Sequence, residues 1–165
     1  MRLLIAFMWL LHWLPLPILG RFGVGVGSVL FLVMRKRRAI ALTNLRLCMP
    51  QLSEQQRVAL ARQHFQAYSR SVWERSILWW SSEERLNRLI KKVPAFPGQQ
   101  IAAKPTILLC PHFVCLDVAG AATAMEISAS SMYVQQKNAA FDQALRAGRS
   151  RFKPPKLFTR QDGIK

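Results

Sequence analysis

The chain opens with two apolar stretches that together predict a membrane anchor. Residues 3–19 carry no charged side chain, and the stretch is just long enough to cross a bilayer as one helix. A second apolar run covers residues 22–34, which is short for a span, and a basic cluster follows it at residues 35–38. We therefore expect residues 1–34 to form helices that either span the membrane or lie in its interface.

The charges around these stretches predict a topology. Only Arg2 precedes the first stretch, whereas five basic residues lie between positions 20 and 38. Because basic residues concentrate on the inner side of a membrane, the rest of the chain is expected in the cytoplasm. A cleaved signal peptide is the rival interpretation, but no small-x-small cleavage site is present before Gly23, which favours an uncleaved anchor.

The next segment has the pattern of an amphipathic helix. Ser53 and Gln56 have the spacing of a capping box, and apolar residues then recur at steps of three or four to about Trp80. The opposite side carries four arginines, Arg57, Arg62, Arg70 and Arg75. This side is either solvated or placed against anionic lipid. A second, shorter helix is predicted to begin at Ser82.

From position 106 the pattern changes to that of an α/β region. Residues 106–110, TILLC, lie between two prolines and predict a buried strand. The elements expected after it are a helix over residues 114–125, a strand over 131–134, a helix over 139–149 and a strand beginning at 156–158. The predicted fold class is therefore α/β, a sheet with flanking helices over residues 35–165, preceded by the helical anchor.

Composition narrows the class of partner. The chain has 24 Lys and Arg against 8 Asp and Glu, a net charge of +16, which predicts attraction to anionic lipid, phosphorylated substrates or nucleic acid. Three cysteines are too few for a disulfide scaffold and fit a reducing compartment. Cys110, His112 and Cys115 suggest a metal site, but a structural zinc site would need a second cluster, so we expect no metal.

One pair of residues has the spacing of reactive groups. His112 directly follows the predicted strand, where open α/β sheets place reactive side chains, and Asp117 comes five residues later. The two can meet only if His112 lies in a turn and Asp117 in the first turns of the next helix, because five helical residues turn the chain by about 500°, leaving the side chains about 140° apart. A carboxylate that orients an imidazole lets the free nitrogen take a proton from a hydroxyl. We interpret His112 as a general base and Asp117 as its partner. The alternative is a hydrogen-bonded histidine near a helix start.

Four segments identify a resemblance. The blocks IALTNLRLCMP, PHFVCLD, SMYVQQKN and AGRSRF occur in this order, and from about Leu10 to Lys165 the chain resembles the late acyltransferases of lipid A biosynthesis. These are the lauroyl and myristoyl transferases of the Gram-negative inner membrane. The resemblance implies a glycerolipid-acyltransferase-like fold and transfer of a fatty acyl group from acyl carrier protein to a hydroxyl of a phosphorylated lipid A precursor. It implies no cofactor.

The resemblance also assigns roles to individual residues. His112 and Asp117 fall on the family's base and its acidic partner. The positions that fall on substrate-contacting residues are Arg149, Arg151, Tyr133, Lys137 and Asn138. At Val134 and Gln135 this chain departs from the Arg-Pro that many members have. The family continues for roughly as many residues again, so we expect this chain to be the amino-terminal part of the acyltransferase domain, without its carboxyl-terminal half.

Three rival interpretations remain beside this one. A thiol nucleophile at Cys110 or Cys115 lacks an identifiable base of its own. A nucleic-acid-binding protein is supported by charge alone, because the aromatic residues do not alternate with basic ones along a strand. An inactive, membrane-associated remnant of the enzyme is the third. Detergent-dependent solubility with acyl transfer would support the enzyme, and detergent-dependent solubility without transfer would support the remnant. Salt-sensitive binding to oligonucleotides would support the nucleic-acid binder.

Overall fold

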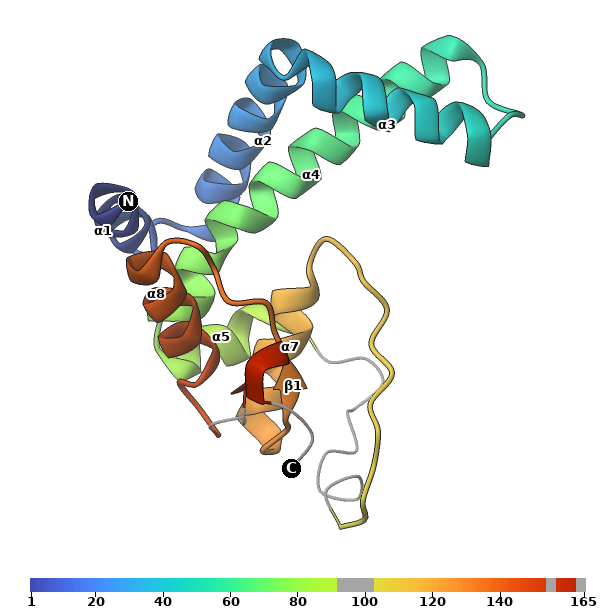
Figure 1. Cartoon of the computed structure of the whole chain (residues 1–165). Coiled ribbons are helices and arrows are strands. Elements are labelled where there is room, and N and C mark those ends of the chain that lie inside the picture. The colour runs from blue at the N-terminus through green and yellow to red at the C-terminus, as the bar shows by residue number, and fades with distance from the viewer. Residues whose placement is uncertain (92–102, 154–156, 163–165) are drawn as a thin grey trace. The chain divides into compact units, whose positions relative to one another are not determined.

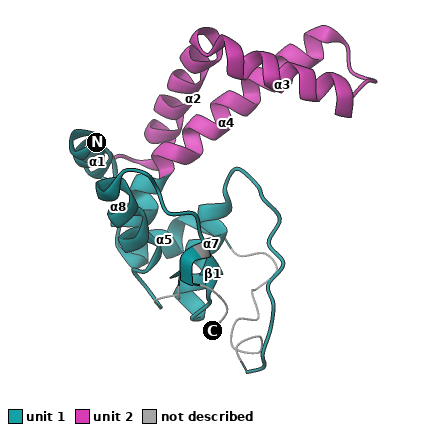
Figure 2. Cartoon of the chain, in the orientation of Figure 1, with its two compact units in different colours: residues 1–13, 75–165 teal, residues 14–74 magenta. Residues whose placement is uncertain are grey.

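The computed structural model of the chain describes residues 1–91, 103–153 and 157–162. Two units divide the chain: unit 1 holds residues 1–13 and 75–165, and unit 2 holds residues 14–74 (Figure 2). The described residues are mostly helical, with one small sheet (Figure 1). The elements are α1 Arg2–Leu11, α2 Leu16–Val33, α3 Arg35–Cys48, α4 Glu54–Trp80, α5 Glu83–Leu89, α7 Leu116–Glu126, β1 Ser131–Met132, α8 Ala139–Arg149, β2 Leu157–Phe158 and the 3-10 turn η1 Arg160–Asp162.

The apolar start forms two helices instead of one. α1 ends at Leu11, and Pro15 is the N-cap of α2. Proline lacks a backbone N–H and clashes with a preceding helical turn, but the start of a new helix accepts it. The expectation of one helix over residues 3–19 is therefore wrong. α2 has 18 residues because it joins the end of the first stretch to the second, and it is, by length and composition, the one described helix that could cross a membrane.

In unit 2, α2 packs on α4 at very short range. A Cβ atom at Gly23 would lie 2.6 Å from the Arg70 Cα, and one at Gly27 would lie 2.5 Å from the Gln66 Cα. Only glycine permits this approach of the two backbones. Phe31 then packs edge-to-face against an aromatic ring of α4, that of Phe65, with the centroids 5.6 Å apart.

The predicted capping box is confirmed at the start of α4. The Ser53 N–H donates to Gln56 Oε1 at 2.8 Å, and the Gln56 N–H donates to Ser53 Oγ at 3.2 Å. These reciprocal bonds satisfy two donors that a helix start leaves free. The helix ends at Trp80, as expected, and Ser82 caps the next helix by accepting a bond from the Arg85 N–H at 3.3 Å.

In unit 1 the end of α4 packs with α1, α5, α7 and α8. The helices predicted over residues 114–125 and 139–149 are confirmed as α7 and α8, the second with the same bounds. α8 approaches α4 closely, since a Cβ at Gly148 would lie 2.3 Å from Trp79 Cδ1. The buried apolar side chains here include Met8, Leu11, Ile77, Leu78, Trp79, Leu86, Ala124, Ile127, Tyr133 and Leu145.

The sheet is smaller than predicted. β1 and β2 pair in parallel, with Ser131 opposite Leu157 and Met132 opposite Phe158, and α8 lies between them in sequence. The strands predicted over residues 131–134 and 156–158 are thus confirmed as two residues each, with Lys156 outside the described residues. Parallel strands need a crossover connection, and α8 supplies it.

Residues 106–110 do not form the predicted strand. They have no regular secondary structure and pair with no strand in the described part of the chain. Ile107 and Leu109 expose 97% and 95% of their surface, so the apolar run that suggested burial is not buried. A strand requires a neighbour for its N–H and C=O groups, and an apolar run cannot specify that neighbour by itself.

Candidate active site

The segment from Pro111 to Asp117 is a turn that leads into α7. The Phe113 N–H donates to the Pro111 carbonyl at 3.0 Å, and the Leu116 N–H donates to the Phe113 carbonyl at 3.2 Å. α7 begins at Leu116, which places Asp117 in its first turn and His112 in the turn before it. This half of the geometry required for the predicted pair is confirmed. The carboxylate is also favourable where it lies, near the positive end of the helix dipole.

Two arginines from distant parts of unit 1 converge on Asp117. Arg75 Nε donates to Asp117 Oδ2 at 2.6 Å, and Arg149 Nη2 donates to Oδ1 at 2.7 Å. The Asp117 side chain is only 16% exposed. Burial raises the pKa of its carboxyl, but the attraction of the two guanidinium groups and their hydrogen bonds outweigh this, so the pKa lies below its usual value. Asp117 is therefore ionised at neutral pH.

Arg75 is a site residue that the sequence did not indicate. Its position on α4 placed it among the arginines expected on the exposed side of that helix, but its side chain is 25% exposed and is paired with Asp117. The two residues are 42 positions apart. No local spacing connects residues at that separation, so the pairing was visible only in the fold.

His112 and Asp117 are not joined by a hydrogen bond. Within the described residues His112 is exposed, and its imidazole has neither a hydrogen-bond nor an ion-pair partner. Cys110 and Cys115 are exposed free thiols. No group of three His, Cys, Asp or Glu side chains in the described ranges is arranged to hold a metal ion. The roles of His112 and Asp117 in catalysis remain a prediction.

Arg151, a predicted substrate contact, donates hydrogen bonds to backbone carbonyls at the end of α4. Its Nη1 donates to the Leu78 carbonyl at 2.7 Å and its Nη2 donates to the Ser81 carbonyl at 2.5 Å. Carbonyls at the end of a helix lack intrahelical partners, and a cation is favourable beside them. Burial lowers the pKa of Arg151 from its usual value, although the group stays charged at neutral pH.

The remaining predicted contacts lie around the start of α8. Asn138 is the N-cap of that helix, and its Oδ1 accepts a bond from the Phe141 N–H at 3.1 Å. Tyr133 is buried, with the Arg146 guanidinium 6.0 Å from its ring centroid. Lys137 is exposed. The motif alone thus did not show that Arg151 and Asn138 bond to backbone groups or that Tyr133 is buried.

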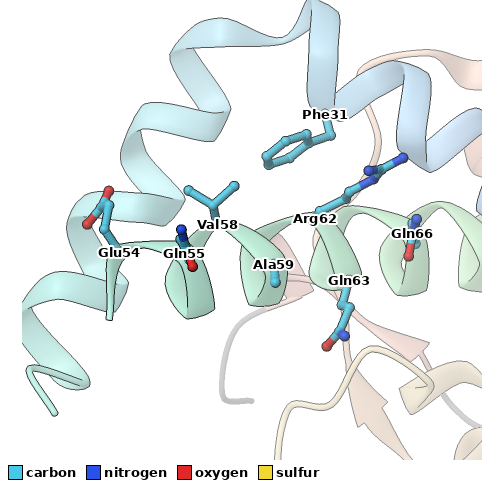
Figure 3. Close-up of a pocket in the computed structure, with 8 residues that line it drawn as sticks. All are labelled: Phe31, Glu54, Gln55, Val58, Ala59, Arg62, Gln63 and Gln66. Atoms are coloured by element: carbon cyan, nitrogen blue, oxygen red, sulfur yellow. The ribbon is translucent and has the colours of Figure 1, made fainter. Parts of the chain in front are cut away.

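Two hollows lie elsewhere on the described surface. The first, about 660 Å³, is in unit 2, where Val58 and Arg62 point from α4 toward Phe31 (Figure 3). The second, about 610 Å³, is in unit 1, with walls that include Trp9, Trp79 and Arg151. Neither His112 nor Asp117 lines either hollow. The Asp117 cluster therefore lies outside both hollows.

Comparison with known proteins gives a consistent result. The family model described as "Bacterial lipid A biosynthesis acyltransferase" matches residues 1–165. The chain is 26% identical to the lipid A biosynthesis lauroyltransferase of Escherichia coli K12 over 149 residues, covering 89% of this chain and 49% of the relative. It is 24% identical to the palmitoleoyltransferase of the same organism, covering 68% and 38%. With a lipid A biosynthesis acyltransferase of Haemophilus influenzae the identity is 25%, covering 84% and 45%.

The matched relatives are much longer than this chain. The chain spans about half, or less, of the curated relatives it matches. No solved structure shows a significant similarity to it.

Proposed function

The chain belongs to the bacterial lipid A biosynthesis acyltransferase family, and from that membership we propose that it carries the reaction centre of an enzyme that acylates a lipid A precursor. The donor in this proposal is a fatty acyl thioester of acyl carrier protein, and the acceptor is a hydroxyl of the phosphorylated precursor. The enzyme works at the cytoplasmic side of the inner membrane. The observation that carries the proposal is the family match over the whole chain.

In the proposed reaction His112 acts as a general base. One imidazole nitrogen takes the proton of the acceptor hydroxyl while the hydroxyl oxygen attacks the thioester carbonyl. The tetrahedral oxyanion then collapses, the carbon–sulfur bond breaks, and the thiol of the carrier leaves with the proton that His112 returns. No acyl-enzyme and no cofactor are needed. His112 is exposed, so its imidazole is accessible both to the Asp117 carboxylate and to the acceptor hydroxyl when the substrate binds.

The surroundings of Asp117 support its role as the partner of His112. Its low pKa keeps the carboxylate charged, as required of a group that stabilises an imidazolium. Oδ1 accepts two hydrogen bonds from Arg149 and Oδ2 accepts one from Arg75, so Oδ2 keeps a lone pair for an imidazole N–H. The two arginines hold the carboxylate in one orientation. Arg75 is in this view a positioning residue.

The basic and polar residues after β1 are proposed substrate contacts. Arg149 has 35% of its side chain exposed and has donors to spare beyond those on Asp117, so it can bind a phosphate of the acceptor. Arg151, Tyr133, Lys137 and Asn138 complete this set in the proposal. For Arg151 and Asn138 the contact would be additional to their backbone bonds.

Acyl transfer by a protein of the relatives' length that contains this chain tests the proposal. Purified in detergent, it should move a labelled acyl group from acyl carrier protein to the phosphorylated precursor, and His112→Ala should abolish this. Circular dichroism of the His112→Ala variant verifies folding. A folded protein without transfer would support the inactive remnant instead. Salt-sensitive binding to oligonucleotides would support the nucleic-acid alternative.

A further inference from the structure

α2 has two apolar faces, and only one of them is covered. The face against α4 holds its buried residues, Leu19, Gly20, Gly23, Gly27 and Phe31. The uncovered face presents a stripe of large apolar side chains, Ile18, Val29, Leu32 and Val33, exposed from 50% at Ile18 to 64% at Val33. A continuous exposed stripe of this kind marks a surface that meets lipid or a protein partner.

The covered face of α2 packs on α4, so α4 must lie beside α2 in any environment. α4 runs alongside α2 in unit 2 (Figure 2), from Arg70 at Gly20 to Phe65 at Phe31. α4 brings polar and charged groups with it. Gln66 donates to Ser28 Oγ at 2.9 Å in the carboxyl-terminal half of α2. Arg70 forms an ion pair with Glu74 at 2.5 Å.

These neighbours make a membrane-spanning α2 unfavourable. Its 18 residues measure about 27 Å, close to the roughly 30 Å hydrocarbon thickness, so a span would use the entire helix. The exposed polar side chains of this part of α4, Gln63, His64 and Arg70, would then lie at hydrocarbon depth beside the paired Gln66. Charged groups are strongly disfavoured there unless they line a cavity or pair within a bundle. A helix that lies along the surface keeps α4 in water and still buries the stripe.

A basic cluster directly follows the stripe. Unit 2 has nine Lys and Arg residues against two acidic ones, Glu54 and Glu74, and both acids are already paired. Arg35, Lys36 and Arg37 are exposed, and none of them has a partner among the described residues. They lie in the first turn of α3, where cations oppose the helix dipole, so helix stability does not explain them.

We propose that α2 and the start of α3 form a docking surface for one leaflet of an anionic phospholipid bilayer. The stripe from Ile18 to Val33 enters the acyl chains parallel to the membrane plane, and Arg35, Lys36 and Arg37 bind head-group phosphates. A lipid occupant is favoured over an acidic protein because the cations adjoin an apolar stripe. The acidic surface of a carrier protein could pair with the cations but would leave the stripe uncovered. The docking does not depend on acyl transfer.

Depth measurements along the stripe test the orientation. Single cysteines replace Ile18, Gly25, Val29 or Leu32 in the full chain, whose native cysteines are changed to serine. Each cysteine carries a nitroxide, and the chain is bound to vesicles of phosphatidylcholine and phosphatidylglycerol. Accessibility to oxygen and to a water-soluble nickel complex should give one similar, shallow depth at all four positions. A control label at Gln63, which points away from α2 (Figure 3), should remain in water. A depth that peaks at Gly25 and falls toward both ends would establish a span and overturn the proposal.

Charge removal tests the role of the cations. Changing Arg35, Lys36 and Arg37 to Gln should weaken binding to phosphatidylglycerol-containing vesicles on the order of 100-fold, about fivefold for each cation, and leave binding to phosphatidylcholine unchanged. Changing the exposed Arg88, Lys91 and Lys104 of unit 1 to Gln removes the same charge and should have a much smaller effect. Equal losses in the two variants would overturn the proposal. So would loss of acyl carrier protein binding with vesicle binding intact.

Discussion

The Arg149 guanidinium donates two hydrogen bonds to one oxygen of Asp117. Its Nε and Nη2 lie 3.2 Å and 2.7 Å from Asp117 Oδ1. This pair joins the last residue of α8 to the first turn of α7, across 32 positions of sequence. With Arg75 on the second oxygen, three helices of unit 1 meet at a single carboxylate. The cluster is thus part of the fold as well as part of the proposed reaction centre.

Asp117→Asn should reveal this structural role through its pH dependence. The folded-state pKa of Asp117 is lowered, so its ionised form contributes stability above the unfolded-state value of about 3.9, and that contribution is lost as pH falls through the folded-state pKa. At neutral pH the variant should be less stable by about 1 to 3 kcal/mol. Denaturation of both proteins in detergent from neutral pH to below pH about 4 measures this. A difference that stays constant with pH would contradict it.

Arg75→Ala should destabilise unit 1 by about 1 kcal/mol and raise the pKa of the Asp117 carboxyl, because one of its two cations is lost. NMR titration of the labelled carboxyl measures the second effect. Arg62→Ala is the matched control on the same helix: Arg62 is exposed, and the change should alter stability by less than about 0.5 kcal/mol. If Arg75→Ala left the Asp117 titration unchanged, the ion pair would have no energetic role.

Local signals predicted the helices well. The capping box of Ser53 and Gln56 sets the start of α4, and the predicted bounds of residues 139–149 are those of α8. These features depend on residues three or four positions apart, which is the range over which helix bonds form. Pro15 is an equally local signal, because a proline divides an apolar stretch where a new helix begins.

The features that the sequence did not predict depend on distant residues. Residues 106–110 have the composition of a strand, but a strand exists only with a paired neighbour, which composition does not supply. Arg75 meets Asp117 only because α4 and α7 pack together. The motif indicated Asp117 as a catalytic partner and Arg149 as a substrate contact, and it gave no sign that the two would bond directly.

Gly27→Ala should disrupt unit 2, whereas Gly25→Ala should not. A Cβ at residue 27 would lie 2.6 Å from the Phe65 carbonyl oxygen and closer still to the Gln66 Cα, so α2 and α4 must move apart, at a cost of about 1 to 3 kcal/mol. A Cβ at residue 25 meets nothing within 4 Å, and alanine there should raise stability by up to about 1 kcal/mol through helix propensity. Thermal unfolding in detergent compares them. Similar behaviour of the two variants would show that α2 does not pack on α4 as described.

Asn138→Ala and Asn138→Asp separate capping from substrate contact. Alanine removes the acceptor for the Phe141 N–H and should cost about 1 kcal/mol of stability, whereas aspartate keeps the acceptor and should retain it. If Asn138 also contacts a phosphate, aspartate should raise KM for the phosphorylated acceptor in a protein of full family length, because like charges repel. Stability curves and kinetics together assign both roles. An unchanged KM in the aspartate variant would leave Asn138 as a cap alone.

The last prediction concerns His112 and Asp117 as a reacting pair, in a protein of full family length that contains this chain. His112→Ala should remove nearly all transfer, and Asp117→Asn should lower turnover by roughly 10² to 10⁴, measured at a temperature where the destabilised variant remains folded. The double variant should be little worse than the worse single variant, because an orienting carboxylate has no function without its imidazole. Cys110→Ala and Cys115→Ala should retain transfer, since both thiols are exposed and take no part in direct attack. Additive losses in the double variant would mean that Asp117 serves only the arginine cluster, and the assignment of His112 as its partner would be wrong.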